Sequence, residues 1–222
     1  MKIEAIGAMA LVIYLLSELA VWVLGRFIKV ANREKYQDFL FEAIDDLALP
    51  AGARKYFERF TPEFERLGFR PVGDYLLLKG TTRAVSRFFI SPDGRAVAGI
   101  DDWRWLLLRT RTYSLMSVFD DGTYLESAPM QAPADRLSKS THLRLHYCPG
   151  ASVEELYERH QQAVGEHAER HGAEVLAVSG EEFKQVVNYG HRLLHHAMYA
   201  KGLVPEPPPL ESEGTLVAAA GK

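Results

Sequence analysis

A run of apolar residues near the amino terminus is the feature that most constrains how this chain can fold. Residues 5–24 include ten Leu, Ile and Val side chains and one charged side chain, that of Glu18. At about 1.5 Å per residue, a helix of that length spans about 30 Å, which matches the hydrocarbon core of a bilayer. The aliphatic side chains together favour insertion by more than the roughly 3 kcal/mol cost of a central acidic residue. The pattern therefore predicts a transmembrane helix within residues 1–30.

A cleaved signal peptide is the alternative for the same segment. Its uninterrupted apolar part, residues 5–16, has the length of a signal-peptide core. The charge of Lys2 is offset by Glu4, however, and Val23-Leu24-Gly25 is a poor cleavage site. We therefore expect the segment to be retained as a single membrane pass.

Positive charges flank this segment unequally. Lys2 precedes it, while four basic residues follow it closely: Arg26, Lys29, Arg33 and Lys35. Basic residues next to a membrane helix stay on the cytoplasmic side. The expected location is the plasma (inner) membrane, with the C-terminal domain in the cytoplasm.

The acidic residue inside the segment suggests a contact within the membrane. Tyr14, Glu18 and Trp22 are four residues apart and form one stripe of a helix. A protonated Glu18 can hydrogen-bond across a helix pair, which predicts a homo-oligomer or a partner membrane protein bound through the N-terminal helix. The alternative is that one carboxylic acid is tolerated there and that Trp22 only anchors the helix at the lipid interface.

The rest of the chain has the pattern of one α+β domain, residues 31–204. Helical spacing of apolar residues predicts helices over residues 33–48, 54–60, 61–67 and 152–170, and a last helix that ends at Gly202. Ser152 and Glu155 are spaced as a capping box at the start of the fourth helix. The Pro-rich tail, residues 205–222, is expected to be disordered.

Between these helices the apolar period changes to that of strands. The turn sequences Pro92-Asp93-Gly94 and Asp120-Asp121-Gly122 separate short apolar runs. Residues 101–105 fit either a strand or a loop. The pattern predicts an antiparallel β-meander of about five to six strands covered on one side by helices, with strands over residues 75–78, 85–91, 96–100, 112–119, 123–127 and 142–147.

The order of these elements resembles that of bacterial single-pass membrane-anchored proteins that remain uncharacterised. The residues that carry the resemblance follow the membrane segment in this order: Leu67-Gly68-Phe69, Gly73-Asp74-Tyr75, Pro92-Asp93-Gly94, Phe119-Asp120-Asp121-Gly122, and a helix that holds His160. The resemblance covers most of residues 60–165. It implies a membrane anchor and no particular activity.

Composition excludes several common functions. The net charge is −3, so the chain as a whole has no positive field to attract nucleic acid. A single cysteine, Cys148, excludes an internal disulfide and a multi-cysteine metal centre. The sequence has no glycine-rich phosphate loop and no Gly-x-Ser-x-Gly motif. We expect neither a nucleic-acid partner nor a cofactor.

All eight histidines lie between positions 142 and 196. Two histidines one helical turn apart can share a metal ion. However, His167-Ala168-Glu169-Arg170-His171 places its glutamate differently from a zincin helix, and no Pro-Cys-x-x-Cys follows it. We therefore assign no metal, catalytic or cofactor-binding residue, and keep as metal candidates His142, His146, His167, His171, His191 and His195.

A cysteine beside a histidine and a pair of adjacent aspartates are two further groups that could belong to a functional site. His146 lies two residues from Cys148 and could lower the pKa of its thiol, although a buried structural cysteine explains the residue equally well. Asp101 and Asp102 are adjacent, so on a strand they point to opposite faces, and next to Trp103 one of them could line a pocket.

Two functions from different classes are consistent with these patterns. The first is a membrane-tethered, non-enzymatic domain that binds a protein partner or an apolar ligand between sheet and helices. The alternative is a membrane-bound metal-dependent hydrolase that uses the histidine cluster. The positions of the histidines distinguish these two functions, because a metal site needs three or more ligands around one point.

Overall fold

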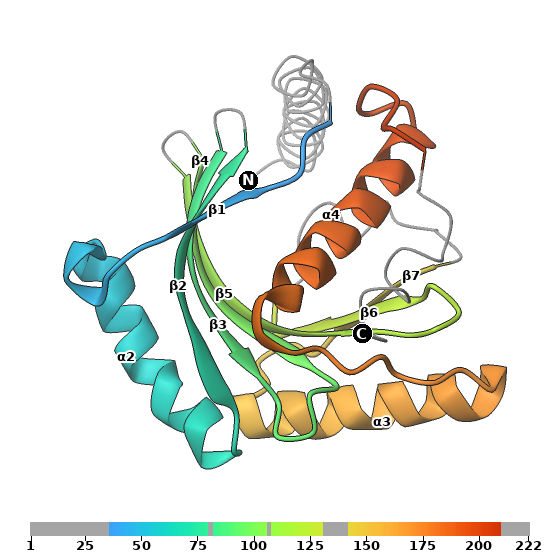
Figure 1. Ribbon diagram of the computed structural model, residues 1–222, viewed down its shortest axis with the longest axis horizontal. Coiled ribbons are helices and arrows are strands. Elements are labelled where there is room, and N and C mark those ends of the chain that lie inside the picture. The colour runs from blue at the N-terminus through green and yellow to red at the C-terminus, as the bar shows by residue number, and fades with distance from the viewer. Residues whose placement is uncertain (1–35, 80–81, 106–107, 131–141, 210–222) are drawn as a thin grey trace, which may run out of the picture.

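A seven-stranded sheet forms the centre of the protein (Figure 1). The computed structural model describes residues 36–79, 82–105, 108–130 and 142–209. Neighbouring strands pair in chain order, antiparallel except for β6 and β7, which are parallel. The strands are β1 (Leu40–Ala43), β2 (Arg70–Lys79), β3 (Thr82–Ile90), β4 (Val97–Trp105), β5 (Leu108–Val118), β6 (Tyr124–Ala128) and β7 (Leu143–Tyr147).

Within the described ranges, three α-helices and two short 3-10 helices accompany the sheet. They are η1 (Asp46–Ala48), α2 (Ala51–Arg66), α3 (Val153–His171), η3 (Gly180–Glu182) and α4 (Phe183–Tyr199). The strongly bent sheet wraps around α4, while α2 and α3 lie on its outer side (Figure 1). The predicted α+β class is confirmed, but helices cover both faces of the sheet and not one.

Alternation along the strands supplies both apolar faces. On the inner face, Tyr75, Leu77 and Phe88 pack with Phe183 and Leu193 of α4. On the outer face, the neighbouring residues of the same strands pack against α2 and α3; this cluster includes Phe57, Phe64, Phe89, Ile100, Leu115 and Leu156. A two-residue period therefore gives each strand one side chain for each layer.

The prediction of a helix over residues 33–48 is wrong for the described part of that segment. Residues 40–43 form β1, which pairs with β2, and a 3-10 turn follows. Phe39 and Phe41 both point to the inner face, where their rings lie 5.7 Å from Trp103 and Phe183, respectively. The side-chain amide of Asn188 on α4 accepts a hydrogen bond from Phe39 N at 2.9 Å. These contacts favour the extended backbone over a helix.

Two short helices predicted over residues 54–60 and 61–67 are instead one helix, α2, with Pro62 inside it. Proline removes one backbone hydrogen bond from the helix. Phe57, Phe60 and Phe64 lie on one buried stripe across that position. Because each buried phenylalanine contributes roughly 1.5–3 kcal/mol, keeping the stripe continuous outweighs the lost bond.

The later elements match their predictions closely. Ser152 and Glu155 form the predicted capping box at the start of α3, and Gly172, with φ of 67°, ends that helix. Residues 101–105, which fitted either a strand or a loop, belong to β4. Strands β2, β3, β4 and β5 are longer than predicted, since their pairing continues past the apolar runs into charged residues.

The predicted membrane helix, with Tyr14, Glu18 and Trp22, lies outside the described residues. Within the described ranges, no helix is both long and apolar enough to cross a membrane. Most of the Pro-rich tail, residues 210–222, also lies outside the described part. Its first residues pack on the domain, where Pro207 is buried and His196 Nε2 lies 3.0 Å from Pro208 O.

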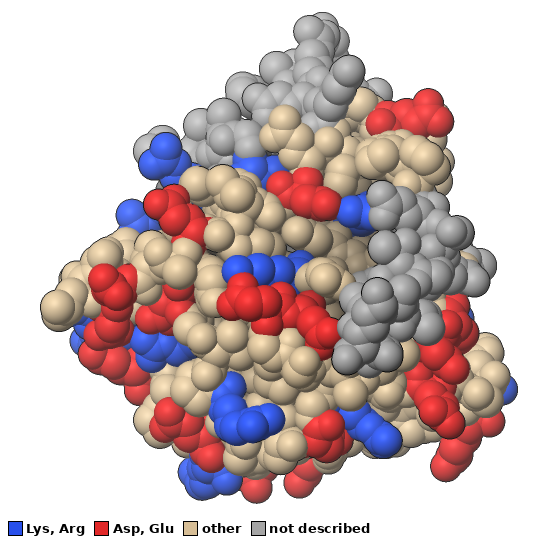
Figure 2. All heavy atoms as spheres, in the orientation of Figure 1, with Lys and Arg blue, Asp and Glu red and all other residues tan. Residues whose placement is uncertain are grey.

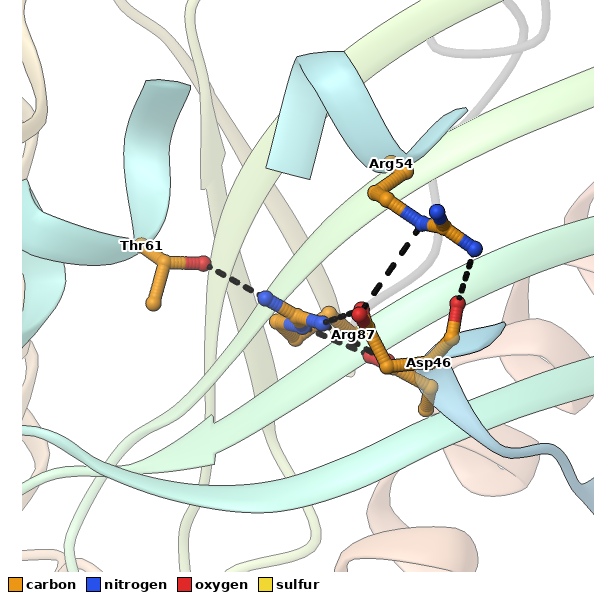
Figure 3. Close-up of polar contacts among 5 residues, drawn as sticks. Asp46, Arg54, Thr61 and Arg87 are labelled. Carbon is orange, nitrogen blue, oxygen red and sulfur yellow. Dashed lines mark hydrogen bonds and ion pairs between the residues drawn. The ribbon is translucent and has the colours of Figure 1, made fainter. Parts of the chain in front are cut away.

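Arg87 ties three elements of the outer face together (Figure 3). From β3, its guanidinium donates to both oxygens of Asp74 on β2, each at 2.7 Å. It also donates to Thr61 of α2 at 3.1 Å and to Asp46 of η1 at 3.0 Å. A planar guanidinium can satisfy several acceptors at once, so one side chain fixes the position of α2 on the sheet.

Replacing Arg87 should destabilise the fold more than replacing an exposed arginine. The side chains of Arg87 and Asp74 are only 16% and 7% exposed, so Arg87→Ala leaves a nearly buried carboxylate unpaired. We expect the free energy of unfolding to fall by about 2–3 kcal/mol, measured by urea denaturation. Arg66→Ala is the control, because its pair with Glu154 is exposed and should cost less than about 1 kcal/mol. Equal losses in the two variants would contradict this role.

Candidate functional site

A cavity of about 470 Å³ lies between α3 and the end of the sheet where β3 turns into β4. One wall is the turn with Asp93, Arg95 and Ala96; the floor contains Ser117 of β5. The second wall is the face of α3 formed by Tyr157, His160, Gln161, Val164, Gly165 and Ala168, and the third is the extended segment Ala173, Glu174 and Val175.

The turn between β3 and β4 is held rigidly by its own side chains. Asp93 Oδ1 accepts hydrogen bonds from Ser91 Oγ at 2.6 Å and from Arg95 N at 3.1 Å. Ser91 Oγ also accepts from Ala96 N at 2.9 Å. Burial raises the pKa of the Asp93 carboxyl, but these hydrogen bonds outweigh it, so that the pKa is lowered. This wall is therefore formed before any ligand binds.

Backbone pairing fixes the third wall. After Gly172 the chain reverses and runs beside the end of β5, where Leu176 N donates to Val118 O at 2.9 Å. Val178 N then donates to Gly94 O at 2.7 Å, which joins this wall to the turn opposite. This wall is thus an extended segment with one isolated bridge, Phe119 to Val175.

His160, in the α3 wall, bonds Ser117 of the cavity floor and also Ser127, which is not part of the cavity lining. Its Nε2 lies 2.9 Å from Ser117 Oγ and its Nδ1 lies 3.0 Å from Ser127 Oγ. Ser117 donates its one hydroxyl proton to Arg95 O at 2.7 Å, so it must accept from His160 Nε2–H, and Ser127 must donate to Nδ1. Burial, and the nearby His146, lower the pKa of His160 to about 3. The imidazole is therefore neutral, and neither nitrogen is free to act as a base.

The chemistry of the cavity follows from this arrangement. Its polar floor is neutral and already satisfied, while Tyr157, Val164, Ala168 and Ala173 supply apolar walls. The charged groups of Asp93, Arg95 and Glu174 belong to exposed residues. The arrangement suits an apolar ligand, because no buried charge has to be matched.

No family model, curated protein or solved structure matches this chain. The site is therefore interpreted from its own geometry. Sequence analysis placed His160 on a helix, but the serines that bond it are 43 and 33 residues away, and no sequence spacing indicated them.

The six metal candidates fall into three separate places. His142 and His146 lie at β7, His167 and His171 on α3, and His191 and His195 on α4. His167 and His171 stack with 4.5 Å between ring centroids, and His167 Nε2 lies 3.0 Å from Asp121 Oδ2. Within the described part of the chain, no three His, Cys, Asp or Glu side chains form a group that could hold a metal ion. The predicted pairs exist, but the structure does not bring them together.

His191 has an unexpected partner in Lys79. The Lys79 ammonium contacts His191 Nε2 and lies 4.7 Å from the centre of the Tyr36 ring. Burial lowers the pKa of Lys79 to about 8 and, with the lysine charge, lowers that of His191 as well. His195, whose ring lies 4.9 Å from that of Tyr36, also has its pKa lowered, by burial, to about 4. Sequence reasoning missed this cluster, because its members come from three distant segments.

Cys148, the candidate nucleophile of the sequence analysis, is completely buried. Its Sγ lies 3.9 Å from His146 Nδ1. A substrate from solvent cannot reach a sulfur with 0% exposure, so the geometry favours the structural interpretation of this thiol.

Asp101 and Asp102 point to opposite faces, as predicted. Asp101 faces α4, where it accepts a hydrogen bond from Ser86 Oγ at 2.5 Å. Burial raises the pKa of its carboxyl to about 6, against a partly offsetting effect of Ser86. Asp102 lies on the outer face and binds Arg109, whose guanidinium donates to Oδ1 at 2.7 Å. Burial opposes ionisation of Asp102, but Arg109 and Arg111 outweigh it and lower its pKa.

The raised pKa of Asp101 predicts how stability depends on pH. The folded state holds this proton up to about pH 6, whereas the unfolded chain loses it near 3.8. The contribution of Asp101 to stability is therefore full below the lower value and is lost as pH rises to about 6. At pH 8 Asp101→Asn should be more stable than the parent by roughly 3 kcal/mol, and the gain should vanish towards pH 4.

Urea denaturation of both proteins across this pH range measures the difference. Asp102→Asn is the matched control on the other face, and it should lower stability at pH 8, because it leaves Arg109 and Arg111 without their carboxylate. A gain from Asp101→Asn that is independent of pH would show that the carboxyl does not titrate as stated.

Proposed function

We propose that this chain is a membrane-tethered, non-enzymatic binding domain that takes an apolar ligand into the cavity between α3 and the sheet. The observation that carries the proposal is the cavity itself, about 470 Å³ with mainly apolar walls and a neutral floor. Ligand pockets in proteins typically have volumes of about 300–1,000 Å³ and combine apolar walls with a few polar groups.

Gly165 supports a binding role for this cavity. It lies inside α3, where glycine costs about 1 kcal/mol relative to alanine. A Cβ atom at this position would meet nothing within 4 Å. Packing within the domain therefore does not require glycine here, whereas an open cavity does benefit from the missing side chain.

The tether is proposed from the composition of residues 5–24, which lie outside the described part of the chain. The basic residues that follow this segment support a location of the domain on the cytoplasmic side of the plasma (inner) membrane. A contact through Tyr14, Glu18 and Trp22, with a second copy or a partner membrane protein, remains part of the proposal for this segment.

A metal-dependent hydrolase is not proposed. It would need at least three ligands around one point, and the described residues contain no such group. The one buried serine–histidine pair in the cavity has both imidazole nitrogens engaged, with the Ser117 proton directed to a backbone carbonyl. This arrangement does not activate the serine as a nucleophile.

Filling the cavity should abolish binding. Gly165→Phe places an aromatic side chain in the open space, and we expect photolabelling of the full chain by benzophenone, a neutral apolar probe, to fall at least fivefold. Labelling is measured in lipid nanodiscs by mass spectrometry of the peptides that contain Tyr157 to Ala168. Direct mapping of the labelled residues separates the cavity from probe dissolved in the bilayer.

Gln162→Phe is the matched control, because it adds the same side chain on the exposed side of the same helix. It should leave labelling of the cavity residues unchanged. Equal labelling of the parent and Gly165→Phe proteins, or labelling that avoids the cavity residues, would contradict the proposed site.

The tether predicts that the full chain resists alkaline carbonate extraction from bacterial membranes. A variant without residues 1–30 should appear in the soluble fraction, since the apolar segment is then missing. Protease should degrade the domain in inside-out vesicles and not in intact cells. A mature protein whose first residue lies after position 24 would show a signal peptide instead.

A further inference from the structure

Three arginines form a row across the sheet. Arg83 of β3 is directly opposite Arg104 of β4, and Arg104 is directly opposite Arg109 of β5. Because they occupy paired positions, all three side chains project from the same face, the outer face of the sheet. All three residues are exposed. In Figure 2, Lys and Arg side chains are visible at the upper left, over the end of the sheet that lies there in Figure 1.

Repulsion among these arginines lowers the stability of the folded domain. Like charges directly opposite one another on neighbouring strands are destabilising. Arg109 is neutralised by Asp102, whose side chain is 1% exposed. Arg83 and Arg104 have no hydrogen bond or ion pair with another described residue. Asp102, whose pKa the nearby charge of Arg104 also lowers, supplies one negative charge against the three positive charges of the row. The row therefore keeps an excess of positive charge.

The row lies at the end of the sheet where the chain enters the domain. The connection from β2 to β3 and that from β4 to β5 are both at this end, because the strands are antiparallel. Tyr36, the first described residue, lies there too, with Lys79 Nζ 4.7 Å from its ring centre. Residues 25–35 separate it from the apolar segment, and this length of chain reaches no further than about 40 Å when fully extended.

We propose that Arg83, Arg104 and Arg109 form a docking surface for anionic lipid headgroups of the membrane that holds the chain's own N-terminal segment. The inference rests on the membrane tether proposed above. The short connection keeps the row near the bilayer, and the charge of the row complements the anionic cytoplasmic leaflet. Guanidinium groups bind phosphate oxygens through paired hydrogen bonds, which suits phospholipid headgroups.

The reactivity of individual arginines tests this surface directly. The full chain is placed in nanodiscs of phosphatidylcholine alone, or of phosphatidylcholine with 30% phosphatidylglycerol, and treated with phenylglyoxal, a neutral arginine reagent. Mass spectrometry gives the modification rate of each arginine. We expect Arg83 and Arg104 to react at least threefold more slowly on the anionic discs, with the difference removed by 0.5 M NaCl, because salt screens the attraction.

Arg70 and Arg159 are the matched controls within the same molecule. Both are exposed; Arg70 is at the other end of the sheet, and Arg159 is on α3. Their rates should not depend on lipid composition. Equal rates for Arg83 on the two kinds of disc, or the same slowing at Arg70, would overturn the docking surface. Slowing by added RNA on neutral discs, without an effect of phosphatidylglycerol, would assign another occupant and also overturn it.

The same experiment distinguishes a failure of the docking surface from a failure of the membrane tether. If the chain does not remain in either disc during gel filtration, the tether is wrong and the docking surface falls with it. If the chain remains in both discs and its arginines react equally, only the docking surface is wrong.

Discussion

Close packing of α4 into the inner face of the bent sheet is the contact on which the rest of the structure depends. Gly190 lies against the ring of Tyr124, in a space that has no room even for a methyl group. Phe183, Val186 and Leu193 fill the same face on either side. A bent sheet exposes a large concave apolar surface, and only a helix that approaches this closely can cover it. With the inner face filled, α2 and α3 are left to cover the outer one, and the cavity lies between α3 and the turn that joins β3 to β4.

Local signals in the sequence were sufficient for much of this fold. Ser152 with Glu155 and the Asp-Gly turns each act over a few residues, so their effect can be recognised without the tertiary structure. Residues 40–43 were missed because Phe39, Leu40 and Ala43 also have helical spacing, and only contacts with α4 decide between a helix and a strand. Pro62 was read as a boundary because proline removes a backbone hydrogen bond and is common in the first turn of a helix.

The candidate site could be predicted less well than the fold. The helix that holds His160 could be predicted, but the environment of this histidine depends on Ser117 and Ser127, which are distant in sequence and adjacent only after the sheet forms. Clustering of histidines along the chain was a poor guide, because β7, α3 and α4 point their imidazoles in different directions. Cavities arise from imperfect contact between elements, which no single segment encodes.

The cavity and the arginine row lie at opposite ends of the sheet. Ser117, at the floor of the cavity, and Arg109, in the arginine row, lie on the same strand eight residues apart, which is about 27 Å along β5. In a domain that meets the bilayer at its arginine row, contact with the headgroups and entry of a ligand then take place at opposite ends of the same strand. The two binding events would not compete for one surface, so the cavity could fill and empty while the row stays on the membrane.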